Sequence, residues 1–307
     1  MSGPATGRPA SVPVAWLAVV LLWSTTPLAI NWSLEGGSFA FAVFSRMLIG
    51  LLCAVLVLLT TGVGFPLRRE VWPAYLVGGA SLFGTMLCTY WGAQFIHSGL
   101  LSVIFGLSPL VTSVMAVLWL KERALTPVRV VGMLLALGGL VIVFGDGQGL
   151  GSPQAGIGLA AVLLAVFINS AGLVWMKRVA GHTPPLAITA GVMLVSLPLF
   201  GLAWLITDGH WPASLPLRSL LAIAYLGVFG SVLGFALYYY LMKHMDAAAL
   251  ALITVVTPLL ALFLGRFLND EALPAQVWAG AALISAGLFL HQRGLPALPA
   301  RLRRRTS

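Results

Sequence analysis

The chain has 307 residues, of which 60% are hydrophobic and only 8% are charged, and its formal net charge is +9. An ordinary soluble domain has about 25% charged residues, so 8 acidic and 17 basic side chains cannot cover the surface of a soluble globule of this length. The composition excludes a soluble, a disordered or a nucleic-acid-binding protein and indicates an all-α integral membrane protein.

Long apolar stretches define the expected helices. A transmembrane helix needs about 20 mostly apolar residues, and ten stretches approach this length, separated by short loops rich in Gly, Pro and Asp. The period-2 alternation of a membrane β-barrel is missing. We therefore predict ten transmembrane helices, at residues 12–31, 39–60, 72–92, 98–120, 127–144, 155–176, 185–206, 218–240, 247–268 and 274–291.

Basic residues fall mostly on one side of this topology. With the N-terminus in the cytoplasm, most Lys and Arg residues are cytoplasmic, Arg218 and Arg266 fall outside, and Arg46 lies within the second span. Such a bias is the positive-inside pattern. We expect a multi-pass protein of the cell inner (plasma) membrane with cytoplasmic N- and C-termini. Its basic tail, residues 292–307, is expected to bind anionic lipid headgroups.

The fourth and fifth spans resemble the ninth and tenth in sequence. At one fixed offset, without a gap, Pro109 falls on Pro258 and Glu122 on Glu271. Five spans per half is an odd number, so the second half enters the membrane from the opposite side. Inverted halves are typical of secondary transporters, whose substrate site lies between them. We predict two inverted five-helix repeats, at residues 12–144 and 155–291.

Several short motifs follow one another in a set order along the chain. They are Leu22-Trp23-Ser24, Arg46, Pro109, Glu122, Leu125-Thr126 and Gly132…Gly138-Gly139, then Tyr225-Leu226-Gly227-Val228-Phe229-Gly230-Ser231, Pro258, Glu271, Gly280 and Gly287. Their order resembles the EamA-type repeat of the drug/metabolite transporter superfamily. The resemblance implies a ten-helix transporter, usually an exporter of amino acids, related metabolites or toxic compounds. Ser24 departs from the family pattern, which often has glycine after this tryptophan.

Arg46 is the charged residue that lies deepest inside a predicted span. It is about 10 Å from the outer edge of the second span, and no acidic residue of that span neutralises it. A charge at this depth costs at least a few kcal/mol unless it meets a cavity, a partner or an interface. Two interpretations stay open: a cation beside the substrate path that attracts a carboxylate, or a structural arginine bonded to backbone carbonyls or to Glu35.

Aromatic and polar side chains within the spans are further candidates for a cavity. An apolar pocket with a few aromatic and polar groups suits a small amphipathic solute, and a side-chain amide in hydrocarbon seeks a partner. For each aromatic residue alone, packing against helices or lipid is the alternative. The candidate substrate-binding residues are Trp23, Arg46, Tyr90, Trp91, Asn169, Ser170 and Tyr225.

The repeated prolines and glutamates are candidates for hinges or gates. A proline within a span removes a backbone hydrogen bond and bends the helix, so Pro109 and Pro258 are hinge candidates, with simple packing kinks as the alternative. Glu122 and Glu271 each precede a helix. They either stabilise those helix N-termini or bind a neighbouring loop as a gate.

Motifs for catalysis or cofactor binding are not evident. The histidines are scattered, Cys53 and Cys88 lie in apolar runs, and no Gly-rich phosphate loop occurs. We expect no cofactor, no metal and no nucleic-acid partner; the expected partners are a small-molecule substrate and the lipid bilayer. All carboxylates fall in loops or at span edges, which argues against a buried proton relay. Monomer and dimer both stay open.

These observations favour a secondary transporter that exports small metabolites, and the resemblance implies amino acids or related compounds. The first alternative is a multidrug exporter of the same fold, against which the lack of buried carboxylates counts. A lipid-modifying membrane enzyme would need His, Asp or Glu residues that converge at one interface. The sequence leaves open the substrate, its direction of flow, and whether transport is uniport or proton-coupled.

Overall fold

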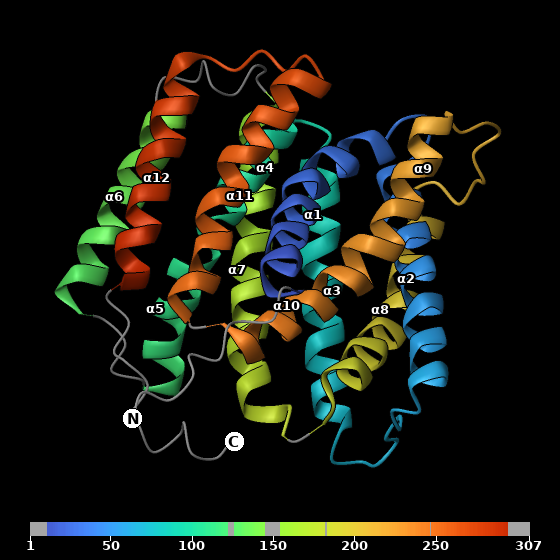
Figure 1. The fold of residues 1–307 in the computed structure, drawn as a ribbon. Coiled ribbons are helices and arrows are strands. Elements are labelled where there is room, and N and C mark those ends of the chain that lie inside the picture. Colours follow the sequence, from blue (N-terminus) through green and yellow to red (C-terminus); the bar gives the residue numbers. More distant parts are fainter. Residues whose placement is uncertain (1–10, 122–125, 145–153, 182, 246, 294–307) are drawn as a thin grey trace, which may run out of the picture.

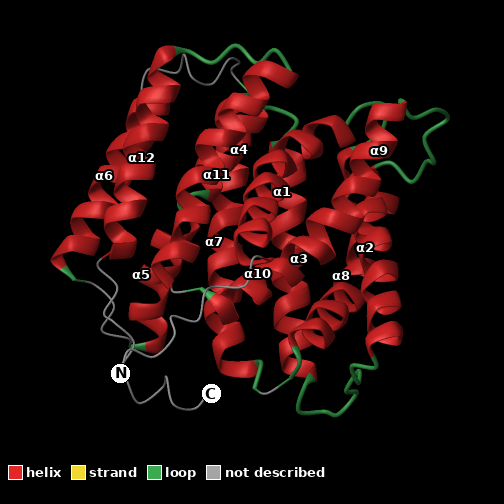
Figure 2. Ribbon diagram, in the orientation of Figure 1, coloured by secondary structure: helices red, strands yellow, loops and turns green. Residues whose placement is uncertain are grey.

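The structure, a computed structural model, describes residues 11–121, 126–144, 154–181, 183–245 and 247–293. Within these residues every regular element is a helix, and most of the loops lie at the two ends of the bundle (Figures 1 and 2). The elements are α1 (Ser11–Ser33), α2 (Phe39–Thr61), α3 (Trp72–Gly92), α4 (Ser98–Phe105), α5 (Ser108–Leu120), α6 (Pro127–Phe144), α7 (Ala155–Val179), α8 (Pro185–Thr207), α9 (Leu217–Tyr225), the π-helix η2 (Leu226–Leu233), α10 (Gly234–His244), α11 (Ala247–Leu268) and α12 (Ala275–Arg293).

Local sequence signals set the ends of α2. Ser38 is the N-cap, and its hydroxyl accepts a hydrogen bond from the Phe41 N–H at 3.2 Å. Gly62 ends the helix in the left-handed conformation, with φ +66°. Both are residue types that favour these positions, because a serine oxygen satisfies a free N–H and glycine has no Cβ to strain.

Seven helical segments of the described residues are long and apolar enough to cross a membrane, and Leu252–Leu268 is a shorter apolar helix. α3 and α12 do not reach this hydropathy, because polar residues and glycines interrupt their apolar runs. The structure thus confirms an all-helical membrane-type fold, while ten spans stay a prediction. The seven segments are Ser11–Ser33, Phe39–Thr61, Ser98–Leu120, Pro127–Phe144, Ala155–Val179, Pro185–Thr207 and Leu217–Tyr238.

Two of the predicted spans are not single α-helices. The stretch 98–120 consists of α4 and α5, because Pro109 has no N–H to continue the α4 hydrogen bonds and instead lies in the first turn of α5. The stretch 218–240 contains η2 between α9 and α10. A π-helix uses more residues per turn than an α-helix and often occurs at functional sites.

Helices from the two halves of the chain pack against each other. α2 packs on α8, α4 on α11, and α6 on α12, while α3 packs on α7 and α8. α9 and η2 pack on α1 and α2, and α10 packs on α1. In Figure 1, α6 and α12 form a pair along one side of the bundle. A Cβ added at Gly139 would lie 2.6 Å from the Gly280 carbonyl oxygen, and one at Gly132 would lie 2.5 Å from that of Gly287. These glycines let the two backbones touch.

Candidate functional site

Arg46 lies inside the bundle, on α2, and only 5% of its surface is exposed. Its guanidinium points toward α3 and η2. The Nη1 donates to the Tyr90 hydroxyl at 3.3 Å and lies 4.0 Å from the Met86 sulfur, and the Nε donates to the Ser231 hydroxyl at 3.5 Å. We call Arg46, Met86, Tyr90 and Ser231 the Arg46 site.

None of the carboxylates in the described residues forms an ion pair with Arg46. Glu35, one of its two expected structural partners, is bound instead by Arg218, whose Nε donates to a Glu35 oxygen at 2.9 Å. The Tyr90 ring adds a weak cation–π contact, with the guanidinium carbon 5.9 Å from the ring centroid. The buried charge is therefore surrounded by neutral groups.

Small residues in η2 bring the second half of the chain close to Arg46. A Cβ added at Gly227 would lie 2.6 Å from the Ile49 side chain, and one at Gly230 would lie 3.6 Å from the Arg46 Nη2. Ser231 donates to the Leu226 carbonyl at 3.0 Å, five residues back. The wide π-turn thus turns the Ser231 hydroxyl toward α2.

The neighbouring face of α1 carries hydroxyl and aromatic groups. Thr25 shares a 2.6 Å hydrogen bond with the Tyr225 hydroxyl. The Trp23 ring lies 4.9 Å from the Tyr238 ring, and a Cβ at Gly234 would come within 3.3 Å of the Trp23 Nε1. The predicted residues Trp23 and Tyr225 therefore lie where α1 meets α9, η2 and α10, beside the Arg46 site.

The other predicted cavity residues lie elsewhere. Trp91, next to Tyr90 in sequence, packs against Phe95 with 5.1 Å between ring centroids. Ser170 on α7 donates to the Ser108 carbonyl at 3.3 Å, and Asn169 beside it is half-buried. Ser170 therefore joins α7 to the start of α5, and the structure records no contact of these three residues with Arg46.

The two repeated prolines belong to neighbouring helices. Pro258 lies inside α11, and a Cβ added at Gly106, in the break between α4 and α5, would lie 3.3 Å from its ring. Pro109 lies in the first turn of α5, three residues after Gly106. A proline of the second half thus packs against the break in the first half.

Glu271 is 4% exposed and binds the N-terminus of α4. Its Oε1 accepts from the Ser98 N–H at 3.0 Å and from the Ser98 hydroxyl at 2.6 Å, and its Oε2 accepts from the Gly99 N–H at 3.3 Å. The helix it caps is in the other half of the chain, whereas the sequence suggested α12, which follows it. Glu122, its predicted counterpart, lies outside the described residues.

Further contacts join the two halves at the same end of the bundle. The Trp32 Nε1 donates to the Asn269 side chain at 3.0 Å, and the Arg218 guanidinium lies 5.5 Å from the centroid of the Trp32 ring. Together with the Glu35–Arg218 ion pair and the Glu271 cap, these contacts form what we call the cross-half network.

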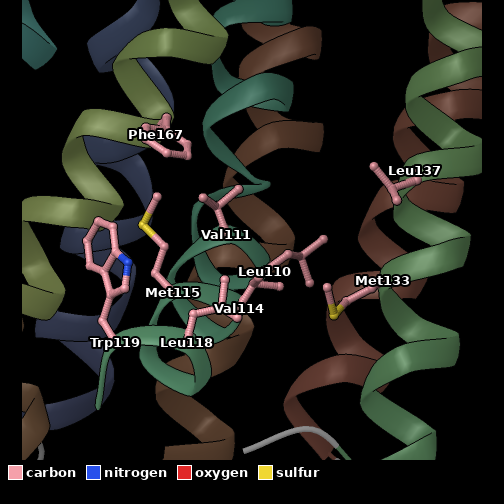
Figure 3. Close-up of a pocket in the computed structure, with 9 residues that line it drawn as sticks. All are labelled: Leu110, Val111, Val114, Met115, Leu118, Trp119, Met133, Leu137 and Phe167. Carbon is pink, nitrogen blue, oxygen red and sulfur yellow. The ribbon is translucent and has the colours of Figure 1, made fainter. Parts of the chain in front are cut away.

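An apolar groove of about 340 Å³ opens between α5, α6 and α7. Figure 3 shows side chains of α5 between Phe167 of α7 and Met133 and Leu137 of α6. Nearly all of its lining surface is apolar, so it suits lipid chains rather than a charged solute. Its lining residues are Leu110, Val111, Val114, Met115, Leu118, Trp119, Met133, Leu137 and Phe167.

Several residues of these sites were not among the predicted ones. Ser231 belongs to the motif that starts at Tyr225, but nothing in the sequence pairs it with Arg46. Thr25 was detectable as part of a polar Thr-Thr-Pro run in an apolar helix. No group of three or more His, Cys, Asp or Glu residues that could hold a metal ion occurs in the part of the chain described.

Long apolar helices that enclose buried polar groups define a polytopic α-helical membrane protein with an internal polar site. The chain belongs to the EamA-like transporter family, whose model matches residues 12–145 and again residues 156–291. It is an EamA-type drug/metabolite transporter.

Three curated relatives align over nearly the whole chain. YedA, an uncharacterized inner membrane transporter of Escherichia coli, is 26% identical over 94% of this chain and 92% of its own. An uncharacterized transporter of Archaeoglobus fulgidus is 24% identical over 90% of this chain and 97% of its own. A probable terminal-alkyne amino-acid exporter of Streptantibioticus cattleyicolor is 25% identical over 91% of this chain and 92% of its own.

Among the solved crystal structures with a similar fold, one aligns over nearly the whole chain. Its TM-score is 0.65 and its sequence identity 24%, and the similarity covers 97% of this chain and 99% of the other.

Proposed function

We propose that this protein is a secondary transporter of the cell inner membrane that exports small metabolites, namely amino acids or related compounds. Membership of the EamA-like transporter family supports transport. The relatives named as an inner membrane transporter and as a probable amino-acid exporter support the location and the substrate class.

The proposed mechanism is alternating access between two inverted five-helix repeats. The family model matches the chain twice, and the packing partners support a two-fold relation. Three of the contacts join helices that are equivalent in the two repeats: α2 with α8, α4 with α11, and α6 with α12. The contact of α3 with α7 has its counterpart in the contact of α9, η2 and α10 with α1. In secondary transporters such a relation lets one fold open to either side.

The observation that carries the proposal is the position of the Arg46 site between the halves. Arg46 and Tyr90 come from the first half and Ser231 from the second, and the charge is enclosed within the bundle. Intramembrane ionisable residues commonly mark substrate pathways. Trp23 and Tyr225 lie beside the Arg46 site. Trp91, Asn169 and Ser170 would line the proposed substrate path away from this site.

The cross-half network supports a gate at the end of the bundle that the charge bias predicts to be external. Glu271 is its buried member, and Glu122 is the proposed equivalent at the opposite end. Pro109 and Pro258, at the contact of the α4–α5 break with α11, are the proposed hinges.

A multidrug exporter of the same fold is the second candidate. Such a protein would favour cationic aromatic compounds, which the nearby aromatic side chains suit but the buried Arg46 charge repels. The location of Arg46 therefore favours amino acids and related metabolites.

The test is transport by the purified protein in liposomes. Labelled amino acids are supplied with and without a pH gradient, and protein-free liposomes are the control. We expect flux that depends on the protein, and its response to the gradient separates uniport from proton coupling. Flux of cationic dyes without flux of any amino acid would favour the second candidate.

A further inference from the structure

The charge on Arg46 has no counter-charge among the described residues. Their carboxylates are all engaged or placed elsewhere: Glu35 binds Arg218, Glu271 caps α4, Asp208 contacts His210, and Glu70 and Asp270 are exposed. A buried ion without an opposite charge costs several kcal/mol. The site is therefore electrostatically incomplete.

The hydrogen bonds of the guanidinium are also weak. Its donor–acceptor distances of 3.3 and 3.5 Å exceed the roughly 2.7–2.9 Å of charge-assisted bonds. The Nη2 has no acceptor among the described residues, yet protein does not fully enclose it. A Cβ added at Gly230 would lie 3.6 Å from this nitrogen, in ordinary contact with the side chains of Leu226 and Thr26, so the glycine leaves about one methyl group of space beside it.

We propose that Arg46, with the hydroxyl of Tyr90, binds the carboxylate of the substrate, while Ser231, whose own proton is donated to the Leu226 carbonyl, holds the guanidinium through its Nε. This inference rests on the proposed function, because an anion that reaches this depth needs a path for solutes. A guanidinium offers two parallel N–H groups that match a carboxylate. The Tyr90 hydroxyl accepts from Arg46, so its proton is free to donate to the ligand.

The number of charges favours a monoanionic group. One carboxylate neutralises the one guanidinium, whereas a phosphate dianion would leave a net negative charge in an apolar bundle. The site also disfavours amines that lack a carboxylate, because no acidic side chain of the described residues lies beside it to balance a second positive charge. Selection of solutes that carry a carboxylate over their amides follows.

The test compares two probes that differ in charge, phenylacetate and phenylacetamide. Ligands that bind the folded state raise the temperature of thermal unfolding, which is measured on the protein in detergent. We expect phenylacetate to raise it with increasing concentration and phenylacetamide to have little effect. Arg46→Gln should abolish the response to phenylacetate, and Arg46→Lys should weaken the apparent affinity at least about tenfold.

Arg266→Gln is the matched control, because Arg266 is exposed on α11 and its loss removes the same charge without changing a proposed ligand group. It should leave the response unchanged. If Arg46→Gln does not fold, Tyr90→Phe provides the readout, and a several-fold weaker response to phenylacetate is expected.

Equal stabilisation by both probes, or an undiminished response in the Arg46 and Tyr90 variants, would overturn the carboxylate site. The liposome assay gives a separate result. Transport of an amino acid and its amide with equal affinity refutes the carboxylate site alone. Charge-dependent binding of phenylacetate without transport of any amino acid refutes the export proposal and leaves the site as an anion site.

Discussion

The Ser98 hydroxyl donates a 2.6 Å hydrogen bond to Glu271, although the two residues are 173 positions apart in the chain. The same carboxylate accepts from the N–H groups of Ser98 and Gly99. A loop of the second half thus supplies the cap for a helix of the first half, at the end of the bundle where the cross-half network lies.

Removal of this cap should destabilise the protein. Glu271→Ala leaves buried N–H groups without an acceptor, and each such group costs about 1–3 kcal/mol. We expect a clear fall in the temperature of thermal unfolding in detergent. Glu271→Gln keeps one acceptor oxygen and should lose less. Equal stability of Glu271→Ala and the parent protein would show that the cap does not contribute to folding.

Cross-linking across the cross-half network tests whether this end opens. Cysteines replace Glu35 and Arg218, which form an ion pair, in a background that lacks Cys53 and Cys88. A cleavable bifunctional thiol reagent should block transport in liposomes, and its reduction should restore it. Each single-cysteine variant treated in the same way controls for modification alone. Full transport by the cross-linked protein would contradict a gate at this end.

Two adjacent glycines of α6 should respond oppositely to alanine. At Gly139 a Cβ would lie 2.6 Å from the Gly280 carbonyl oxygen, so Gly139→Ala forces α6 and α12 apart and lowers stability. At Gly138 the nearest atom, on Leu283, is 3.8 Å away. Gly138→Ala should be neutral or stabilise by up to about 1 kcal/mol, because alanine favours helix. Thermal unfolding of both variants checks this contrast.

The inverted arrangement predicts opposite accessibility for the repeated glutamate positions. Single cysteines at positions 122 and 271 in a cysteine-free background are treated with a membrane-impermeant thiol reagent on intact cells. Because Glu271 is buried, a cysteine there could escape the reagent, so a cysteine that replaces the exposed neighbour Asp270 is labelled as well. We expect labelling at 270 from outside and at 122 only after permeabilisation. Labelling of both from the same side would end the inverted-repeat proposal.

Apolar runs sufficed to predict where the helices lie, because a bilayer requires long uninterrupted helices and leaves few alternatives. Pro109 indicated a bend in the stretch 98–120, and the structure has a break there, after Phe105. The π-helix at Leu226–Leu233 was not predictable, because it depends on packing against another part of the chain: Gly227 lies against Ile49.

The candidate site was predictable in part for a similar reason. The unusual position of Arg46 is visible in the sequence, but its neighbours are set by helix rotation. Tyr90 reaches the guanidinium and Trp91 does not, because consecutive helical residues point about 100° apart. Glu271 was recognised as a possible cap, and its partner Ser98 needed the three-dimensional arrangement.

The number of residues in the π-helix η2 determines which way the Ser231 side chain points. η2 has eight residues, and a π-helix holds more residues in a given axial length than an α-helix does. Loss of a single residue here would relax it to a regular helix and rotate Ser231 away from α2. We therefore expect relatives that have one residue fewer between Tyr225 and Gly234 to carry the arginine equivalent to Arg46 at a different position. A comparison of their sequences would show whether the two changes occur together.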